Sequence, residues 1–213
     1  MAPITTADIR NSQWDEGPVQ YVRTGPTGRL ETTVTVVFRK STGDWEPWVV
    51  VAKSALMASR NLEGFGLYAA RPFRRDDVIG MYDGTVVGTY ASREAALASD
   101  EVRKLVRRQH DKLITRRVPR QRGVQLVDGV TGGPPYLHRC NDPRGTPYGP
   151  NVEIGDTGYM KVTRHRGIPA FDFGVDLAAN VDAELRLDYG QGYWSMMQKL
   201  GTSAKYAIDA DDD

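Results

Sequence analysis

The chain has 213 residues, which is the size of one domain with or without a small extension, and it is long enough to bury a core. Its 28 lysines and arginines nearly balance its 27 aspartates and glutamates, so bulk charge does not indicate nucleic acid or a membrane as the partner. The single cysteine, Cys140, excludes an internal disulfide framework and a cysteine-built zinc site, and we expect no metal.

The N-terminal residues show no secretory signal. Residues 1–11 lack the apolar core of a secretory signal. No apolar run approaches the roughly 20 residues that span a bilayer. We therefore expect a soluble intracellular protein, nuclear or cytoplasmic, with no membrane partner.

The first half of the chain predicts an extension followed by short strands. Residues 1–28 are polar and contain Gly–Pro pairs, which is typical of a loose N-terminal extension. Threonine and valine alternate over 30–40 and valines recur over 47–52, with a turn at Thr42–Gly43–Asp44, so these segments predict a hairpin. Further short strands are expected at 67–70, 78–82 and 85–88.

The sequence predicts one clear helix, after Ser92, which is a suitable N-cap. One stripe at helical spacing is formed by Val102, Leu105, Val106, Gln109 and Leu113. Between Arg103 and Arg122 nine residues are basic and one is acidic, so the segment carries a formal charge of +8 (nine minus one). We therefore expect a basic helix and loop within residues 91–131.

The second half predicts strands separated by long loops rich in glycine and proline. They are expected at 123–127, 152–154, 159–162 and 185–189. Residues 201–213 end in four aspartates and are expected to form an acidic, disordered tail. Many short strands with one helix indicate a mainly β (β-rich α+β) domain and not a doubly wound one.

Four short motifs occur along this β-rich chain. Gly64 and Gly66 flank Phe65 before a strand, and such a turn lets the backbone approach a ligand, although an ordinary turn has the same composition. The others follow in order: Tyr82–Asp83–Gly84; Leu137–His138–Arg139–Cys140–Asn141 with Pro150–Asn151; and Glu184–Leu185–Arg186–Leu187–Asp188–Tyr189–Gly190. Each motif is weak alone, and their order is the stronger signal.

In this order the motifs resemble the SET domain, the fold of protein-lysine methyltransferases, over roughly residues 48–194. The resemblance implies a SET-type fold of several short sheets with a threaded C-terminal segment, spanning 29–200. Residues 91–131 would occupy the place of the family's variable insert. The chain departs from the family at Leu137, where asparagine is usual, and in an inserted loop at 142–149.

The resemblance also implies a chemistry. Members of this family transfer a methyl group from S-adenosylmethionine (SAM) to a lysine of a protein, with a histone tail as the family default. Tyr189 and Tyr82 would be catalytic, and Tyr82, Tyr193 and Trp194 would line the lysine channel. The cofactor would be bound by Gly64, Phe65, Gly66, Tyr68, Leu137, His138 and Tyr189.

Two other interpretations stay open. The Leu137 departure and the inserted loop are compatible with a SET-like domain that binds peptides or serves as a scaffold without turnover. The basic run 103–122 is compatible with a nucleic-acid binder, which would bind with a steep salt dependence. The near-zero net charge and the lack of interleaved aromatic residues in that run count against the second interpretation.

Overall fold

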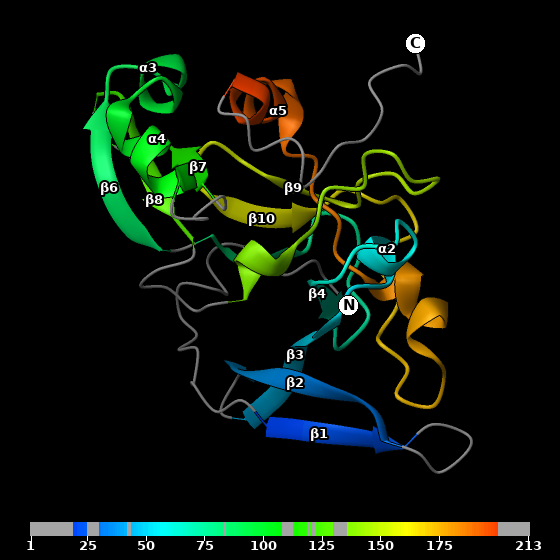
Figure 1. The fold of residues 1–213 in the computed structure, drawn as a ribbon. Helices are drawn as coiled ribbons and strands as arrows, with labels where there is room; N and C mark the ends of the chain where they lie inside the picture. The colour runs from blue at the N-terminus through cyan, green and yellow to red at the C-terminus, as the bar shows by residue number, and fades with distance from the viewer. Residues whose placement is uncertain are drawn as a thin grey trace.

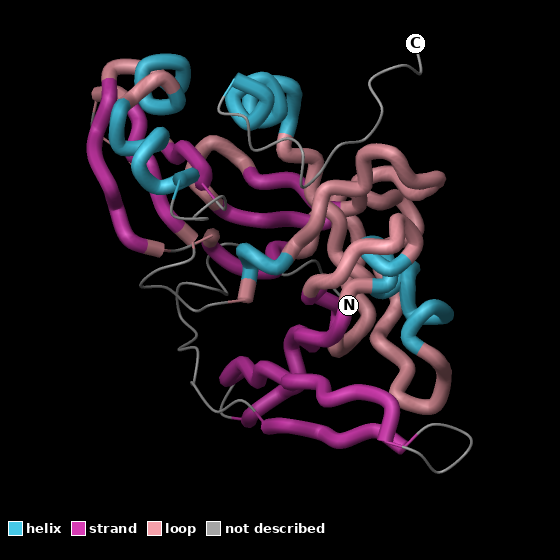
Figure 2. Tube along the Cα trace, viewed as in Figure 1, coloured by secondary structure: helices cyan, strands magenta, loops and turns pink. Residues whose placement is uncertain are grey.

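The computed structural model describes residues 19–24, 30–41, 44–82, 84–107, 113–118, 120, 122–129 and 136–199. Within these ranges the chain is mainly β, with three small antiparallel sheets, short helices and long loops (Figure 2). In Figure 1 the first sheet lies at the bottom, the second in the middle and the third at the upper left. None of the helices described is long and apolar enough to cross a membrane.

The first sheet has the order β1-β2-β3-β4. Its strands are β1 (Val19–Thr24), β2 (Leu30–Ser41), β3 (Asp44–Lys53) and β4 (Phe65–Ala69). Val36 of β2 lies opposite Val50 of β3, and both side chains are buried. The predicted hairpin is therefore confirmed, because two valine-rich strands share one buried face.

The other two sheets have three strands each. The second, in the order β5-β10-β9, contains β5 (Val78–Met81), β10 (Tyr159–Val162) and β9 (Val152–Ile154). The third, in the order β6-β8-β7, contains β6 (Thr85–Tyr90), β8 (Val124–Asp128) and β7 (Leu113–Arg116). These bounds match the predicted strands closely, except that β7 was not predicted.

Helical segments connect and cover the sheets. They are α2 (Ala55–Ala58), α3 (Arg93–Leu97), α4 (Asp100–Arg107), α5 (Gly190–Lys199) and the 3-10 helices η1 (Leu137–Arg139) and η2 (Leu177–Ala183). Buried side chains of α4, α5 and the third sheet share one apolar cluster. This cluster fixes α5 beside the third sheet, and Figure 1 shows the two in proximity.

The prediction of a single basic helix was wrong. Ser92 does cap a helix, since its Oγ accepts a hydrogen bond from the amide of Ala95 (3.2 Å), but α3 is short and α4 follows as a separate helix. Leu113 begins strand β7. Val102, Val106 and Leu113 are buried in the same cluster. Their spacing therefore reflects a shared core and not one continuous helix, while Gln109 lies outside the described residues.

Three further elements differ from the sequence prediction. The strand predicted over 185–189 is absent, because the chain there forms only isolated bridges, such as Arg186 with Asn141 and Leu187 with Val152. Residues 19–24, placed in the loose extension, form β1, with Val22 opposite Thr33 of β2. The helix α5 was not predicted, since the sequence indicated one clear helix only, after Ser92. Residues 1–18 and 25–28, the Thr42–Gly43 part of the turn, Asp83 and the predicted acidic tail fall outside the described residues.

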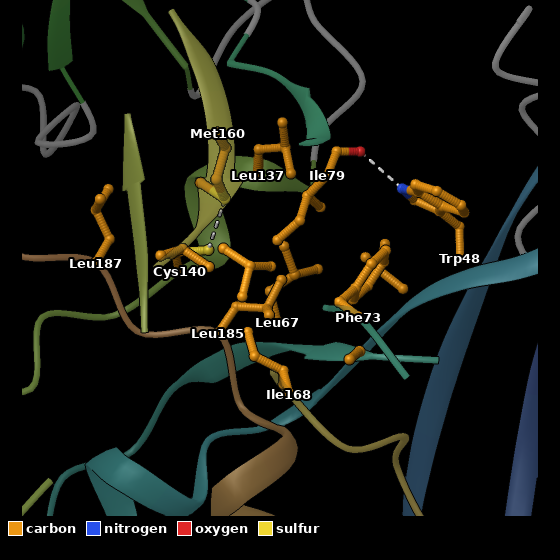
Figure 3. Packing of buried hydrophobic residues seen from close by; sticks show 14 of the residues in the cluster. Trp48, Leu67, Phe73, Ile79, Leu137, Cys140, Met160, Ile168, Leu185 and Leu187 are labelled. Atoms are coloured by element: carbon orange, nitrogen blue, oxygen red, sulfur yellow. Dashed lines mark hydrogen bonds between the residues drawn. The ribbon is translucent and has the colours of Figure 1, made fainter. Parts of the chain in front are cut away.

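The main core lies between the first and second sheets (Figure 3). Trp48 of β3 is 2% exposed, and its indole N–H donates to the carbonyl of Ile79 in β5 (2.7 Å). Phe73 packs edge-on against Trp48, with ring centroids 5.0 Å apart. Leu185 and Leu187, from the last predicted motif, reach this core from a segment far along the chain.

Candidate functional site

The segment 184–187 is held along both edges by the loop that runs from Asn141 to Asn151. On one edge the amide of Leu187 donates to the carbonyl of Asn141 (3.0 Å). On the other, the amide of Asn151 donates to the carbonyl of Arg186 (3.0 Å), and the Asn151 side chain accepts from the amide of Arg186 (2.7 Å) and donates to the carbonyl of Glu184 (2.8 Å). The loop therefore encloses the segment, and this fixes the position of the residues that follow it, Asp188 and Tyr189.

A pocket of about 210 Å³ opens beside this segment. Its volume is below the roughly 300 Å³ at which pockets for drug-sized ligands begin, so it suits a single side chain. Its walls come from β7, β9, α3, η1, the end of β5 and the start of α5. The lining residues are Tyr82, Arg93, Leu97, Leu113, Ile114, Thr115, His138, Cys140, Ile154, Leu187, Asp188, Tyr189, Gly190 and Tyr193.

Tyr189 is fixed at both ends of its side chain. Its hydroxyl donates to the carbonyl of Cys140 (2.6 Å), and its backbone amide donates to Oδ2 of Asp142 (2.9 Å). Its ring packs edge-on against Tyr193 at 4.8 Å and stacks on Trp194 at 6.1 Å. A phenol that donates its proton still has acceptor capacity, so Tyr189 can orient an incoming donor.

The two other tyrosines of the pocket are buried. Tyr82 is 3% exposed, and its backbone amide donates to the carbonyl of Gly158 (2.7 Å). A Cβ atom at Gly129 would lie 2.6 Å from the Tyr82 ring, so a glycine there lets the ring take its place. Tyr193 is buried on α5. The structure thus brings the predicted Tyr82, Tyr189 and Tyr193 together, with His138 beside them.

Trp194 lies next to the pocket and does not line it. Its indole N–H donates to Oδ2 of Asp142 (3.0 Å), and the guanidinium of Arg144 lies over its ring at 5.3 Å. The stacking on Tyr189 makes Trp194 the outer support of that ring.

Asp142 holds this arrangement together, and the sequence reasoning missed it. The residue is 6% exposed and its other oxygen, Oδ1, accepts from the amide of Arg144 (2.7 Å). The guanidinium of Arg60 donates to the carbonyls of Asp142 (2.9 Å) and Arg144. Asp142 begins a stretch that reads as an ordinary polar turn, so no local pattern distinguishes it from a solvent-facing residue.

The glycine turn predicted at Gly64–Phe65–Gly66, whose last two residues begin β4 in the structure, lies against a buried carboxylate. A Cβ at Gly66 would lie 2.4 Å from Oε1 of Glu184, and one at Gly64 would lie 2.4 Å from Sδ of Met57. Close internal packing therefore requires a glycine at 66, whereas the flexible end of the Met57 side chain can move away from a Cβ at 64, and Phe65 between them remains 47% exposed. Arg139 places its guanidinium 5.4 Å from the Phe65 ring centroid.

Glu184 is fully buried and accepts three hydrogen bonds. The donors are Oγ of Ser54 (2.5 Å), the amide of Leu56 (2.9 Å) and Nδ2 of Asn141 (3.3 Å). Burial raises the pKa of Glu184, and these donors oppose the rise because they favour the charged form. The carboxylate therefore ties the glycine turn, α2 and Asn141 to the last motif.

Tyr68 and Leu137 lie apart from the pocket. Tyr68 is fully buried, and its hydroxyl donates to the carbonyl of Lys53 (2.8 Å) and accepts from the amide of Ala55 (2.8 Å). Burial, reinforced by Glu184, raises the pKa of Tyr68. The Leu137 side chain is 5% exposed and packs in the main core. Neither side chain is among those that line the pocket.

Asn141 connects the glycine turn with the pocket. Its Nδ2 donates to the carbonyl of Phe65 (3.0 Å) as well as to Glu184. Its neighbours in the chain are Cys140, whose carbonyl receives the Tyr189 hydroxyl, and Asp142. The predicted cofactor turn and the predicted catalytic tyrosine are therefore joined through three consecutive residues.

The basic segment is partly neutralised within the part of the chain that is described. Arg103 pairs with Asp100 (3.1 Å), Arg117 with Asp156 (3.7 Å), and Nε of Arg116 donates to Gln125 (3.3 Å). In the whole part of the chain that the structure describes, there is no group of three or more histidine, cysteine, aspartate or glutamate side chains that could hold a metal ion.

No protein-family model matches the chain, and no curated protein matches it significantly in sequence.

Proposed function

We propose that the protein transfers a methyl group from SAM to the side-chain amine of a lysine in a protein substrate. The observation that carries the proposal is Tyr189. Its hydroxyl is fixed by the Cys140 carbonyl at the wall of a pocket of single-side-chain size, beside Tyr82 and Tyr193. A tyrosine so fixed, at the end of a Glu–Leu–x–x–Asp–Tyr–Gly motif, supports the SET-like interpretation of the sequence.

The pocket favours the reactive form of a lysine. An amine attacks a methyl group only when it is neutral, and burial disfavours its charged form and so lowers its pKa. Tyr82, Leu187 and Tyr193, each at most 7% exposed, supply the desolvating walls. The ring faces also stabilise a methylated ammonium product by cation–π contact. Tyr189 orients the amine through its hydroxyl oxygen, so positioning and desolvation are the main contributions.

The groups around the glycine turn fit the chemistry of SAM. The exposed Phe65 ring offers an apolar face for a planar base, and the Arg139 guanidinium near it offers a cation for the carboxylate of SAM. The Asn141 side chain and the Cys140 carbonyl link that turn to Tyr189, and His138 lines the pocket beside it. When bound, SAM would supply a sulfonium methyl group; as the N–CH3 bond to the lysine forms, the S–CH3 bond would break and neutral S-adenosylhomocysteine would leave.

The test is turnover with and without the Tyr189 hydroxyl. SAM binding is measured by calorimetry, and methylation of lysine peptides is measured with labelled SAM. We expect Tyr189→Phe to lower kcat at least about 100-fold, since general acid–base and positioning groups typically contribute that much, while the Kd for SAM changes little. Tyr90→Phe is the matched control, because Tyr90 is half-buried in a neighbouring apolar cluster and does not line the pocket. Unchanged turnover in Tyr189→Phe contradicts the assignment.

A second candidate function is a peptide-binding module without turnover. Leu137 favours it, because an apolar side chain packed in the core offers no polar contact to the cofactor where the family has asparagine. Peptide binding together with no SAM binding at millimolar cofactor would favour this candidate over the enzyme.

A further inference from the structure

The lining of the pocket is partly buried and apolar and partly exposed and charged. Tyr82, Cys140 and Tyr193 are at most 7% exposed. The exposed lining residues, Arg93 and Asp188, carry opposite charges, and because they are exposed we take them to mark the open end of the pocket, where it meets solvent. A substrate whose side chain fills the pocket would therefore place its neighbouring residues beside these charges.

Arg93 is the charge that remains available to a substrate. Within the described ranges it forms no salt bridge, whereas Arg103 and Arg117 in the same insert are paired. The adjacent Glu94 is engaged at the start of α3, where hydrogen bonds from its own amide and from Ser92 lower its pKa, with a smaller contribution from the charge of Arg93. Asp188 is partly committed, because its Oδ1 accepts from the amide of Gly190 (2.7 Å).

The charge of the insert acts in the same direction. Residues 91–131 contain ten basic and five acidic side chains, a formal net charge of +5 (ten minus five). Arg93 belongs to this insert and lies at the pocket itself. A peptide with further positive charges around its lysine would meet repulsion there, and a peptide with negative charges would be attracted.

We propose that the substrate is a lysine with an acidic residue beside it, and that Arg93 is the residue that selects it. This inference rests on the proposed function and deepens it. The Arg93 guanidinium pairs with the neighbouring carboxylate at the open end while the lysine occupies the aromatic pocket. Lysines in strongly basic segments are poor substrates for the same reason.

The test uses peptide pairs that differ only in glutamate or glutamine next to the lysine. We expect the protein to prefer the glutamate peptide by roughly two- to five-fold in kcat/KM for each acidic residue, the range of an exposed ion pair. The preference should decline as salt rises. Arg93→Glu should reverse it. Arg122→Glu changes net charge equally at an exposed position in the same insert that does not line the pocket, and should reduce the preference much less than Arg93→Glu does.

Binding of the same peptides, followed by fluorescence anisotropy, separates this inference from the proposed function. Methylation with equal kcat/KM for both peptides, or equal loss of preference in both variants, overturns the role of Arg93 and leaves the activity standing. Binding that prefers glutamate and depends on Arg93, without methylation, supports the role of Arg93 and refutes the enzyme. If the protein neither methylates the peptides nor binds them selectively, both the role of Arg93 and the proposed enzyme are overturned.

Discussion

Removal of the Asp142 carboxylate tests the structural basis of the site. Asp142→Ala removes the acceptor of three donors. These are the amide of Tyr189, the indole N–H of Trp194 and the amide of Arg144. A buried donor left without a partner costs about 1–3 kcal/mol. Because Tyr189 and Trp194 are only partly buried and admit some water, we expect the free energy of unfolding to fall by about 2–4 kcal/mol.

Asp142→Asn should be milder. One amide oxygen can accept from both Tyr189 and Trp194, and the NH₂ group then faces the Arg144 amide, so only the third contact is lost. We expect a loss of about 1–2 kcal/mol for this variant.

Urea unfolding, followed by tryptophan fluorescence, measures all three proteins. Asp156→Ala serves as the control, because Asp156 is exposed and pairs only loosely with Arg117 at 3.7 Å, an interaction worth less than about 1 kcal/mol. If Asp142→Ala destabilises the protein no more than Asp156→Ala does, the Asp142 carboxylate does not hold Tyr189 and Trp194 in place, and its proposed structural role is refuted.

Two further predictions concern the buried carboxylate behind the glycine turn. Gly66→Ala should destabilise the protein by about 1–3 kcal/mol in urea unfolding, because the added Cβ would overlap Oε1 of Glu184. The control Gly192→Ala, with open space around it in α5, should be neutral or stabilising by about 0.5–1 kcal/mol. Equal changes in stability for the two variants would contradict the prediction. The pKa of Glu184 is raised on folding, so its contribution to stability is fully present below the ordinary value of 4.5 and is lost as pH rises through the folded-state pKa. Glu184→Gln should therefore show a flatter dependence of unfolding free energy on pH above about 4.5, and an unchanged slope would refute the raised pKa.

The strands could be predicted where their signal is local. The valines of β2 and β3 alternate or run together because both strands face a core, and their pairing follows from a short connection. The β1 strand was hidden because its neighbours are glycines and prolines, which indicate loops. The helix α5 was hidden because Gly190 and Gly192 are poor helix formers, and its stability comes from buried Met196 and Met197.

The candidate site was predictable only in part, for a related reason. The motifs carry Tyr82, His138 and Tyr189, and the fold brings them to one pocket. Asp142, Arg93 and the role of Glu184 depend on contacts between residues far apart in the chain, such as Asp142 with Trp194. No composition or spacing in the sequence encodes such a contact, because the partners meet only after the chain has closed.

The inserted loop 142–149 illustrates why a departure in spacing need not disturb the site. The residues that flank it, Asn141 and Asn151, still bind the two edges of segment 184–187. Lengthening a loop between fixed ends costs little entropy, about 0.6 kcal/mol for each doubling. The Arg60 and Arg186 guanidinium groups further anchor the loop, the first to the Asp142 and Arg144 carbonyls and the second to the Gly149 carbonyl (2.9 Å). Asp142 and Arg144, at the start of this loop, contact Tyr189 and Trp194, so the loop itself supports the position of Tyr189 on which the proposed chemistry depends.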